Sequence, residues 1–556
     1  MRSLRFGLWL VFLLAASIIL IRTLGHAPRH ETPHERLARL VGQQPTTIDL
    51  NRLKNAGAAD LYQLGMGYLQ LWRVHDATTL FEKAVAADST YHNAWIRLVE
   101  CYANPMVENE RALARALERA RATSPGDTLF VSGLRALYET QDFSAAIASL
   151  SSVLRSPHPP ADTRYYLALA YYRLGRLQDC FKYLQPLVKR DATEGRVAEL
   201  SIKRYAAAGE LDHAARDAAD LASVYPEEAT PQALMAQIEL ARGNSSAALE
   251  YAGHALDLDA RCVPAILTRS CLYARAGDYE SARVSYEKLM LFDDMVLSSI
   301  GSEGIAFVDF LAGDFDDGQD VMDEAIRQAM AAGAHRRGLA LSSLLVEYLC
   351  QLGHADAAES VVERWVTEFG DVPVRLARAR IQLLKGNFDA GDDVLAHLTS
   401  EKTWVLWSRR LALDPTELVA LSEIAQEKQG DALDRLMRDE KDRAAVDAGA
   451  AQRRDFFAGY AAFQSGNAEA AIVNFEDGAR RFYGVEFPYH GDPVLYVQSY
   501  FYRAEAQLAG GRHAAARESY TTFLGYWGEA AWDLDAVARA RQKLKTLGEA
   551  TAPPQG

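Results

Sequence analysis

Residues 165–184 read YYLALAYYRLGRLQDCFKYL, and the arrangement around Gly175 returns along the chain at a fixed interval. Gly209, Gly243 and Gly277 follow at successive steps of 34 residues, each in a turn-like context such as Ala-Gly-Glu-Leu or Ala-Gly-Asp-Tyr. An internal period of this length is typical of stacked helix–turn–helix hairpins. We therefore expect an array of helical repeats rather than a set of independent globular domains.

A small residue stands five positions after each of these glycines, and the four are Cys180, Ala214, Ala248 and Ala282. A hairpin of two helices needs glycine where the chain leaves the first helix, because that position often has a positive φ. It needs a small side chain where the two helices approach most closely. One hairpin cannot bury both of its faces, so copies must stack on one another.

The pattern resembles the tetratricopeptide repeat family, whose leucine–glycine, tyrosine and alanine/aromatic positions match Leu64-Gly65, Tyr68, Ala77, Phe81 and Ala84. The resemblance implies an all-α fold, a right-handed superhelical solenoid of helix–turn–helix repeats. It places repeats near residues 58, 92, 127, 161, 195, 229, 263, 299, 339, 372, 452 and 497. Further turn glycines are expected at Gly313, Gly353, Gly386, Gly466 and Gly511. Further small residues of the second helices are Ala112, Ala146, Gly318, Ala358, Gly391, Ala471 and Ala516. Trp72 and Gln141 stand where two repeats would have the turn glycine.

These phases divide the chain into segments. We expect a first array of about ten repeats at 58–405, an irregular helical connector or hinge at 406–451, and two further repeats at 452–530. A capping helix is expected at 531–548, followed by a disordered tail at 549–556. Terminal repeats need such a cap to cover an apolar face.

The N-terminus predicts a membrane anchor. After a short tail at 1–5, an unbroken apolar run from Phe6 to Ile21 is flanked by Arg5 and Arg22. As a helix this run rises about 24 Å, so with its flanks it can span a bilayer. We expect a transmembrane signal anchor at 6–24, with a cleaved signal peptide as the alternative, and a linker at 25–57. The large domain is then expected to be periplasmic or extracytoplasmic, on a bacterial envelope.

Charge and cysteine content narrow the possible functions. The formal net charge is −14, and basic residues form no cluster, which disfavours nucleic acid as a partner. The five cysteines include no CxxC pair, so we expect neither a zinc site nor a disulfide framework.

Two motifs that could carry metal chemistry are better explained otherwise. Residues 30–34, HETPH, match the HExxH zinc pattern, but Pro33 interrupts the helix that this chemistry requires. Residues 313–320 faintly resemble a calcium loop, but Gly313 and Phe315 stand where oxygen ligands belong. We expect no catalytic residue, no metal and no cofactor.

In this repeat class the first helices line a concave groove that holds an extended peptide or a partner helix. The positions expected to face such a groove are Tyr165, Leu169, Tyr172, Glu199, Lys203, Gln237 and Leu267.

The leading functional hypothesis is a non-catalytic, membrane-anchored scaffold or adaptor that mediates protein–protein interactions. Residues 489–496 and 520–547 also resemble the C-terminal repeats found behind receptor-type bacterial serine/threonine kinases, and the kinase itself is absent. That likeness keeps a sensory or regulatory module of a signalling system as an alternative. A third reading is an accessory subunit of an envelope biosynthetic or maturation enzyme.

Overall fold

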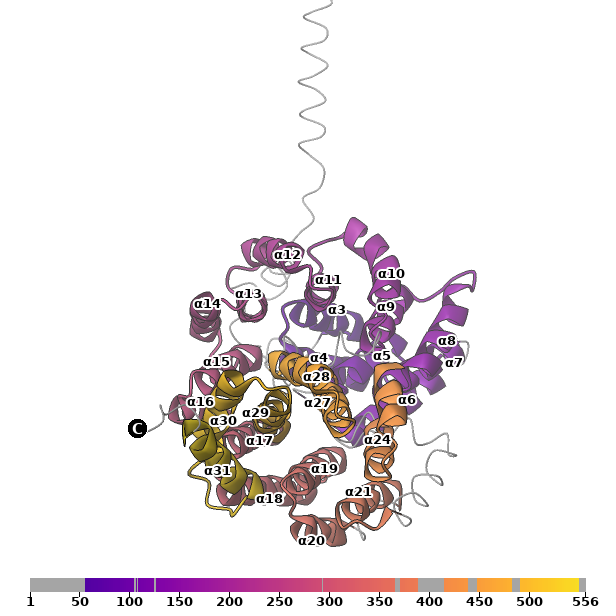
Figure 1. Cartoon of the computed structure of the whole chain (residues 1–556). Helices are drawn as coiled ribbons and strands as arrows, with labels where there is room; N and C mark the ends of the chain where they lie inside the picture. Colours follow the sequence, from indigo (N-terminus) through magenta and orange to yellow (C-terminus); the bar gives the residue numbers. More distant parts are fainter. Residues whose placement is uncertain are drawn as a thin grey trace, which may run out of the picture. The chain divides into compact units, whose positions relative to one another are not determined.

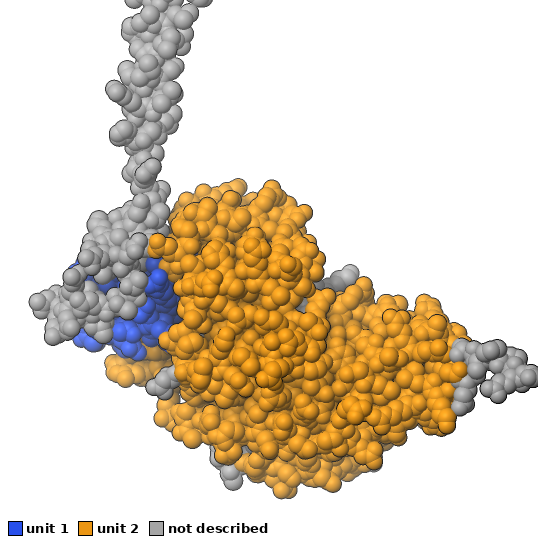
Figure 2. Space-filling view, turned by 90° about the vertical axis from the view of Figure 1, so that its left-hand side faces the viewer, with its two compact units in different colours: residues 1–97 blue, residues 98–556 orange. Residues whose placement is uncertain are grey.

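A computed structural model describes residues 56–104, 107, 109–124, 127–292, 294–365, 371–388, 415–438, 448–482 and 491–549. The expected anchor at 6–24, the HETPH segment at 30–34 and Gly391 lie outside the described residues. The described residues form helices joined by turns, and they fall into two compact units, residues 1–97 and 98–556 (Figure 2).

The first unit contains one complete hairpin. Helix α3 (Ala58–Gln70) packs on α4 (Val74–Ala87), and α5 (His92–Tyr102) begins in this unit and ends in the next. Gly65 lies against the ring of Phe81, so a larger residue would collide with that ring.

The second unit holds the remaining hairpins (Figure 1). It begins with the last residues of α5, and α6 (Glu110–Thr123) follows them. The first helices of the hairpins are α7 (Thr128–Leu134, continued by the π-helical turn η2, Arg135–Glu139), α9 (Thr163–Arg173), α11 (Gly195–Ala207), α13 (Ala229–Ala241), α15 (Val263–Arg275), α17 (Met295–Ala312), α19 (His335–Gln351), α21 (Asp371–Leu384), α24 (Pro415–Ala425), α27 (Ala448–Gln464) and α29 (Pro493–Ala509). The second helices are α8 (Phe143–Leu154), α10 (Leu177–Arg190), α12 (Leu211–Val224), α14 (Ser245–Leu258), α16 (Tyr279–Met290), α18 (Phe315–Ala331), α20 (Ala355–Trp365), α25 (Gln429–Arg438), α28 (Ala468–Arg481) and α30 (His513–Trp527). Helix α31 (Asp535–Glu549) ends the described chain.

The turn glycines have the backbone conformation that the sequence predicts. All nine have φ between 72° and 91°, and they are Gly175, Gly209, Gly243, Gly277, Gly313, Gly353, Gly386, Gly466 and Gly511. Trp72 and Gln141, which replace glycine in two repeats, have φ of 59° and 55°. The turn geometry is therefore kept even where a side chain makes it costly.

The small residues of the second helices lie at the predicted close approaches. Cys180, Ala214, Ala248 and Ala282 are all 0% exposed. Larger side chains at these positions would separate the two helices of each hairpin.

The expected repeat starts agree with the observed helices. Every first helix that matches an expected repeat begins within four residues of it; α17 begins at Met295, for example, where residue 299 was expected. In the segment expected to be an irregular connector, α24 and α25 form a hairpin whose turn residue Glu427 has a φ of 60°. Helix α24 packs on α21 and α27, so this hairpin continues the row of first helices.

Helix α17 is the one described helix that is long and apolar enough to cross a membrane. It is 72% buried inside the protein and belongs to the large hydrophobic core around Phe310 and Leu345. Its composition is thus explained by packing.

Candidate partner-binding groove

The first helices α9, α11, α13 and α15 form a row. Helix α11 packs on α9 and α13, and α13 packs on α15. Figure 1 shows the second helices α10, α12 and α14 on the outer side of this row. Side chains that point away from the second helices therefore share one inner face.

The predicted groove residues fall into two groups by exposure. Tyr165, Leu169, Glu199 and Lys203 are half-buried. Tyr172, Gln237 and Leu267 are buried, with exposures of 3%, 6% and 3%. Only the first group has the side-chain surface that a partner could contact directly.

Glu199 and Lys203 form an ion pair within α11, with Nζ 2.7 Å from the carboxylate oxygen. The Lys203 side chain retains 39% of its exposure. A pair four residues apart on a helix surface contributes only about 0.3–0.5 kcal/mol. Its main effect is to place one acidic and one basic group side by side on the inner face.

A buried arginine next to this pair was not predicted. The Nη1 atom of Arg196 donates to both carboxylate oxygens of Glu100, at 2.9 and 3.0 Å. Other Arg196 nitrogens lie 3.3 Å from Glu194 and 3.5 Å from Asp162. Its guanidinium also covers the ring of Tyr165 at 4.8 Å from the centroid. Arg196 thus joins α5, α9 and α11 and fixes the Tyr165 ring.

Two further tyrosines complete the cluster. The hydroxyl of Tyr166 donates to Glu100 at 3.1 Å, and the Tyr138 ring meets Tyr166 edge-on at 6.1 Å. Burial, followed by the charge of Glu100, raises the pKa of Tyr138 and of Tyr165 well above the ordinary value. These phenols stay protonated, so they remain hydrogen-bond donors.

This arrangement is suited to binding. The partly exposed carboxylate of Glu199 and ammonium group of Lys203 lie on this face, and such groups can pair with peptide amides and polar side chains. All five cysteines are buried, and none of them forms a disulfide bond. Burial raises the pKa of Cys180, Cys262, Cys271 and Cys350 to about 12, which leaves these thiols unreactive. Among the described residues, no cluster of His, Cys, Asp and Glu could hold a metal ion.

No known family model matches the chain, and no curated protein matches it. Solved structures do resemble it. The APC/C hetero-tetramer Cut9–Hcn1 aligns over 88% of this chain and 76% of its own, with a TM-score of 0.40 and 13% identity. Yeast Tom70 aligns over 82% and 96%, with a TM-score of 0.35 and 15% identity. A tetratricopeptide repeat protein from Parabacteroides merdae aligns over 53% and 98%, with a TM-score of 0.28 and 16% identity. At these identities the likeness concerns the fold alone.

Proposed function

We propose that this chain is a non-catalytic scaffold that binds an extended peptide or helix of another protein along the inner face of α9, α11, α13 and α15. The observation that carries the proposal is the row of half-buried side chains Tyr165, Leu169, Glu199 and Lys203 beside the Arg196 cluster. Repeat arrays use such faces to hold partners, because stacked first helices present a long surface of fixed spacing.

A charge reversal on this face tests the proposal. Lys203→Glu places two carboxylates four residues apart, which costs the helix only a few tenths of a kcal/mol, so the fold survives. The matched control is Lys189→Glu, an exposed residue of the second helix α10. Tagged full-length variants are cross-linked in cells and the captured proteins are quantified by mass spectrometry. We expect a reproducible partner to be lost from Lys203→Glu and kept by Lys189→Glu; equal capture by both would contradict the groove.

We further propose that residues 6–24 anchor the scaffold in a membrane with the large domain on the extracytoplasmic side. The support is the apolar run from Phe6 to Ile21 and its flanking arginines. The full chain should need detergent for extraction, whereas a chain without residues 1–24 should not. To test the orientation, a reporter enzyme that works only in the cytoplasm is fused to the C-terminus. Activity of this fusion in cells would contradict an extracytoplasmic domain.

A further inference from the structure

The last described hairpin packs against first helices that lie far before it in the sequence. Asp492 and Trp527 bond to residues that precede them by 141 and 217 positions. Helix α29 packs on both α17 and α19, and α30 packs on α17. Figure 1 shows α29 and α30, in yellow, beside α17. Both α17 and α19 are the first helices of their hairpins.

Two tryptophans anchor this contact. The indole N–H of Trp527 donates to the carbonyl oxygen of Phe310 in α17 at 3.1 Å, and the Trp527 side chain is only 1% exposed. Its ring meets Phe315 edge-on at 5.3 Å. Trp532 donates to a carboxylate oxygen of Asp316 at 2.9 Å, and its ring lies 4.0 Å from that of His354.

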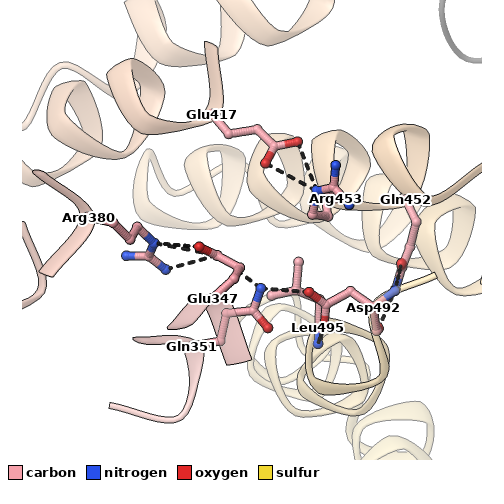
Figure 3. Close-up of polar contacts among 8 residues, drawn as sticks. All are labelled: Glu347, Gln351, Arg380, Glu417, Gln452, Arg453, Asp492 and Leu495. Atoms are coloured by element: carbon pink, nitrogen blue, oxygen red, sulfur yellow. Dashed lines mark hydrogen bonds and ion pairs between the residues drawn. The ribbon is translucent and has the colours of Figure 1, made fainter. Parts of the chain in front are cut away.

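A polar clasp joins α19 to the start of α29 (Figure 3). The amide of Gln351 donates to Glu347 at 3.0 Å and to the Asp492 carboxylate at 2.7 Å. In return, Gln498 donates to the backbone carbonyl of Gln351 at 2.8 Å. Arg380 pairs with Glu347 at 3.3 Å and holds that carboxylate beside Gln351.

Asp492 is itself held rigidly. It caps α29 by accepting from the backbone N–H of Leu495 at 3.0 Å. Gln452 of α27 donates to the Asp492 carbonyl at 2.9 Å and accepts from its N–H at 2.6 Å. Asp492 therefore holds the start of α29 against α27 through its backbone and against α19 through its carboxylate.

We propose that α29 and α30 are an internal occupant of the first-helix face of α17 and α19. In the resting chain this face is closed to other proteins by an autoinhibitory contact. An external helical hairpin with a tryptophan anchor can bind there only after α29 and α30 have left. The proposal rests on this packing alone and does not depend on the groove at α9–α15.

The substitutions that should release α29 and α30 from α17 and α19, called the opening variants, are made in the full-length chain. Trp527→Ala removes the buried tryptophan anchor, and Asp492→Ala removes the carboxylate that bonds Gln351 and caps α29. The matched control is Tyr502→Ala in α29, because the ring of Tyr502 meets the rings of Phe456 in α27 and Phe475 in α28. Circular dichroism shows which variants keep their helices, and Trp532→Ala, a half-buried position, serves if Trp527→Ala does not fold.

The first readout is hydrogen exchange of the α17 amides by mass spectrometry. Losing a buried aromatic anchor should speed exchange in α17 by roughly 100-fold or more. Tyr502→Ala should leave exchange in α17 near the wild-type rate. If none of the three opening variants speeds exchange in α17, these contacts do not close the face and the proposal is wrong.

The second readout is binding in trans. The probe is a fluorescein-labelled peptide of residues 491–528, with the same peptide carrying Trp527→Ala as its control, and binding is followed by anisotropy. We expect no binding to the wild type, binding of the first peptide to the opened variants, and none of the control peptide. If the peptide binds the wild type and the opening variants equally, the claim that α29 and α30 occupy this face in the wild type is wrong. If an opening variant exchanges rapidly in α17 and still binds no peptide, the claim that α17 and α19 form a docking face is wrong.

Discussion

Asp309 in α17 is a buried carboxylate whose charge should weaken the fold. It is 1% exposed, its Oδ1 pairs with Arg283 of α16, and its Oδ2 has no hydrogen-bond partner among the described residues. Burial raises the pKa of Asp309 from 3.8 to about 7; Arg283 opposes the rise, and the nearby charges of Asp314 and Asp317 add to it.

The sign of the pH dependence follows from this shift. Below about pH 4 the carboxyl is protonated in both the folded and the unfolded chain, so it has no effect on stability. Between about pH 4 and pH 7 the unfolded chain releases the proton and the folded chain keeps it. Stability therefore falls as pH rises, by about 1.4 kcal/mol per pH unit in this window. From pH 5 to pH 7 the expected loss around α17 is about 2 to 3 kcal/mol.

Asp309→Asn should remove this slope. The amide has the same shape and can still accept from Arg283, but it carries no charge to bury. We expect the variant to match the wild type near pH 4 and to be more stable at pH 8. The exposed residue Asp320 provides the control Asp320→Asn, which should keep the wild-type slope.

Local hydrogen exchange is the suitable assay, because a long repeat array does not unfold in one step. The opening free energy of the α17 amides is measured from pH 5 to pH 8, with correction for the intrinsic exchange rate. Wild-type protection that rises with pH would refute the reasoning. An unchanged pH slope in Asp309→Asn would refute it as well.

Three further predictions concern packing and reactivity. Gly304→Ala should lower the opening free energy of the α17 amides in hydrogen exchange, because a Cβ atom there would collide with the ring of Tyr286 at a cost of about 1–3 kcal/mol. Gly253→Ala, with no atom within 4 Å of the added Cβ, should instead raise the opening free energy of the α14 amides by about 0.5–1 kcal/mol. Changes of the same sign in the two variants would contradict this reasoning. Gln141→Gly should raise the opening free energy of the neighbouring helix amides by up to about 1 kcal/mol, because glycine relieves a φ of 55°. Faster hydrogen exchange around the turn would show that the side chain is needed. The five buried cysteines should not react with a thiol reagent until the chain is denatured, and fast labelling of the folded protein would contradict their burial.

The sequence predicts the hairpins well because their determinants are local. A residue that leaves a helix with a positive φ is usually glycine, so the spacing from Gly175 to Gly277 marks the turns directly. Gln141 and Glu427 adopt the same conformation with side chains, so composition alone does not reveal those turns. The turn before α25 is nevertheless predictable, because α24 and α25 each have helical spacing and the residues between them are polar.

The contacts between distant hairpins could not be predicted in this way. Arg196 pairs with Glu100 across 96 residues, and Trp527 reaches Phe310 across 217. A repeat pattern specifies how each hairpin packs on the next one. It does not state how far the superhelix turns before α29 meets α17, because small angles add up over many repeats.

The exposure of the predicted groove side chains could not be read from the sequence either. Register alone places Tyr172 and Gln237 on the same face as Tyr165 and Lys203, yet the first two are buried and the last two are not. Burial depends on what packs over each position, which helical spacing does not record. Mutations aimed at the groove are therefore better placed at Tyr165 and Lys203.

The central claim is that a partner lies along the inner face of α9–α15, and site-specific photo-cross-linking in living cells tests it most directly. A photoreactive amino acid is placed at position 203, on the inner face of α11, and in a second strain at position 189, on the exposed side of α10. We predict a discrete adduct with another protein from position 203 and none from position 189. Adducts from position 189 alone, or from both positions equally, would contradict the groove.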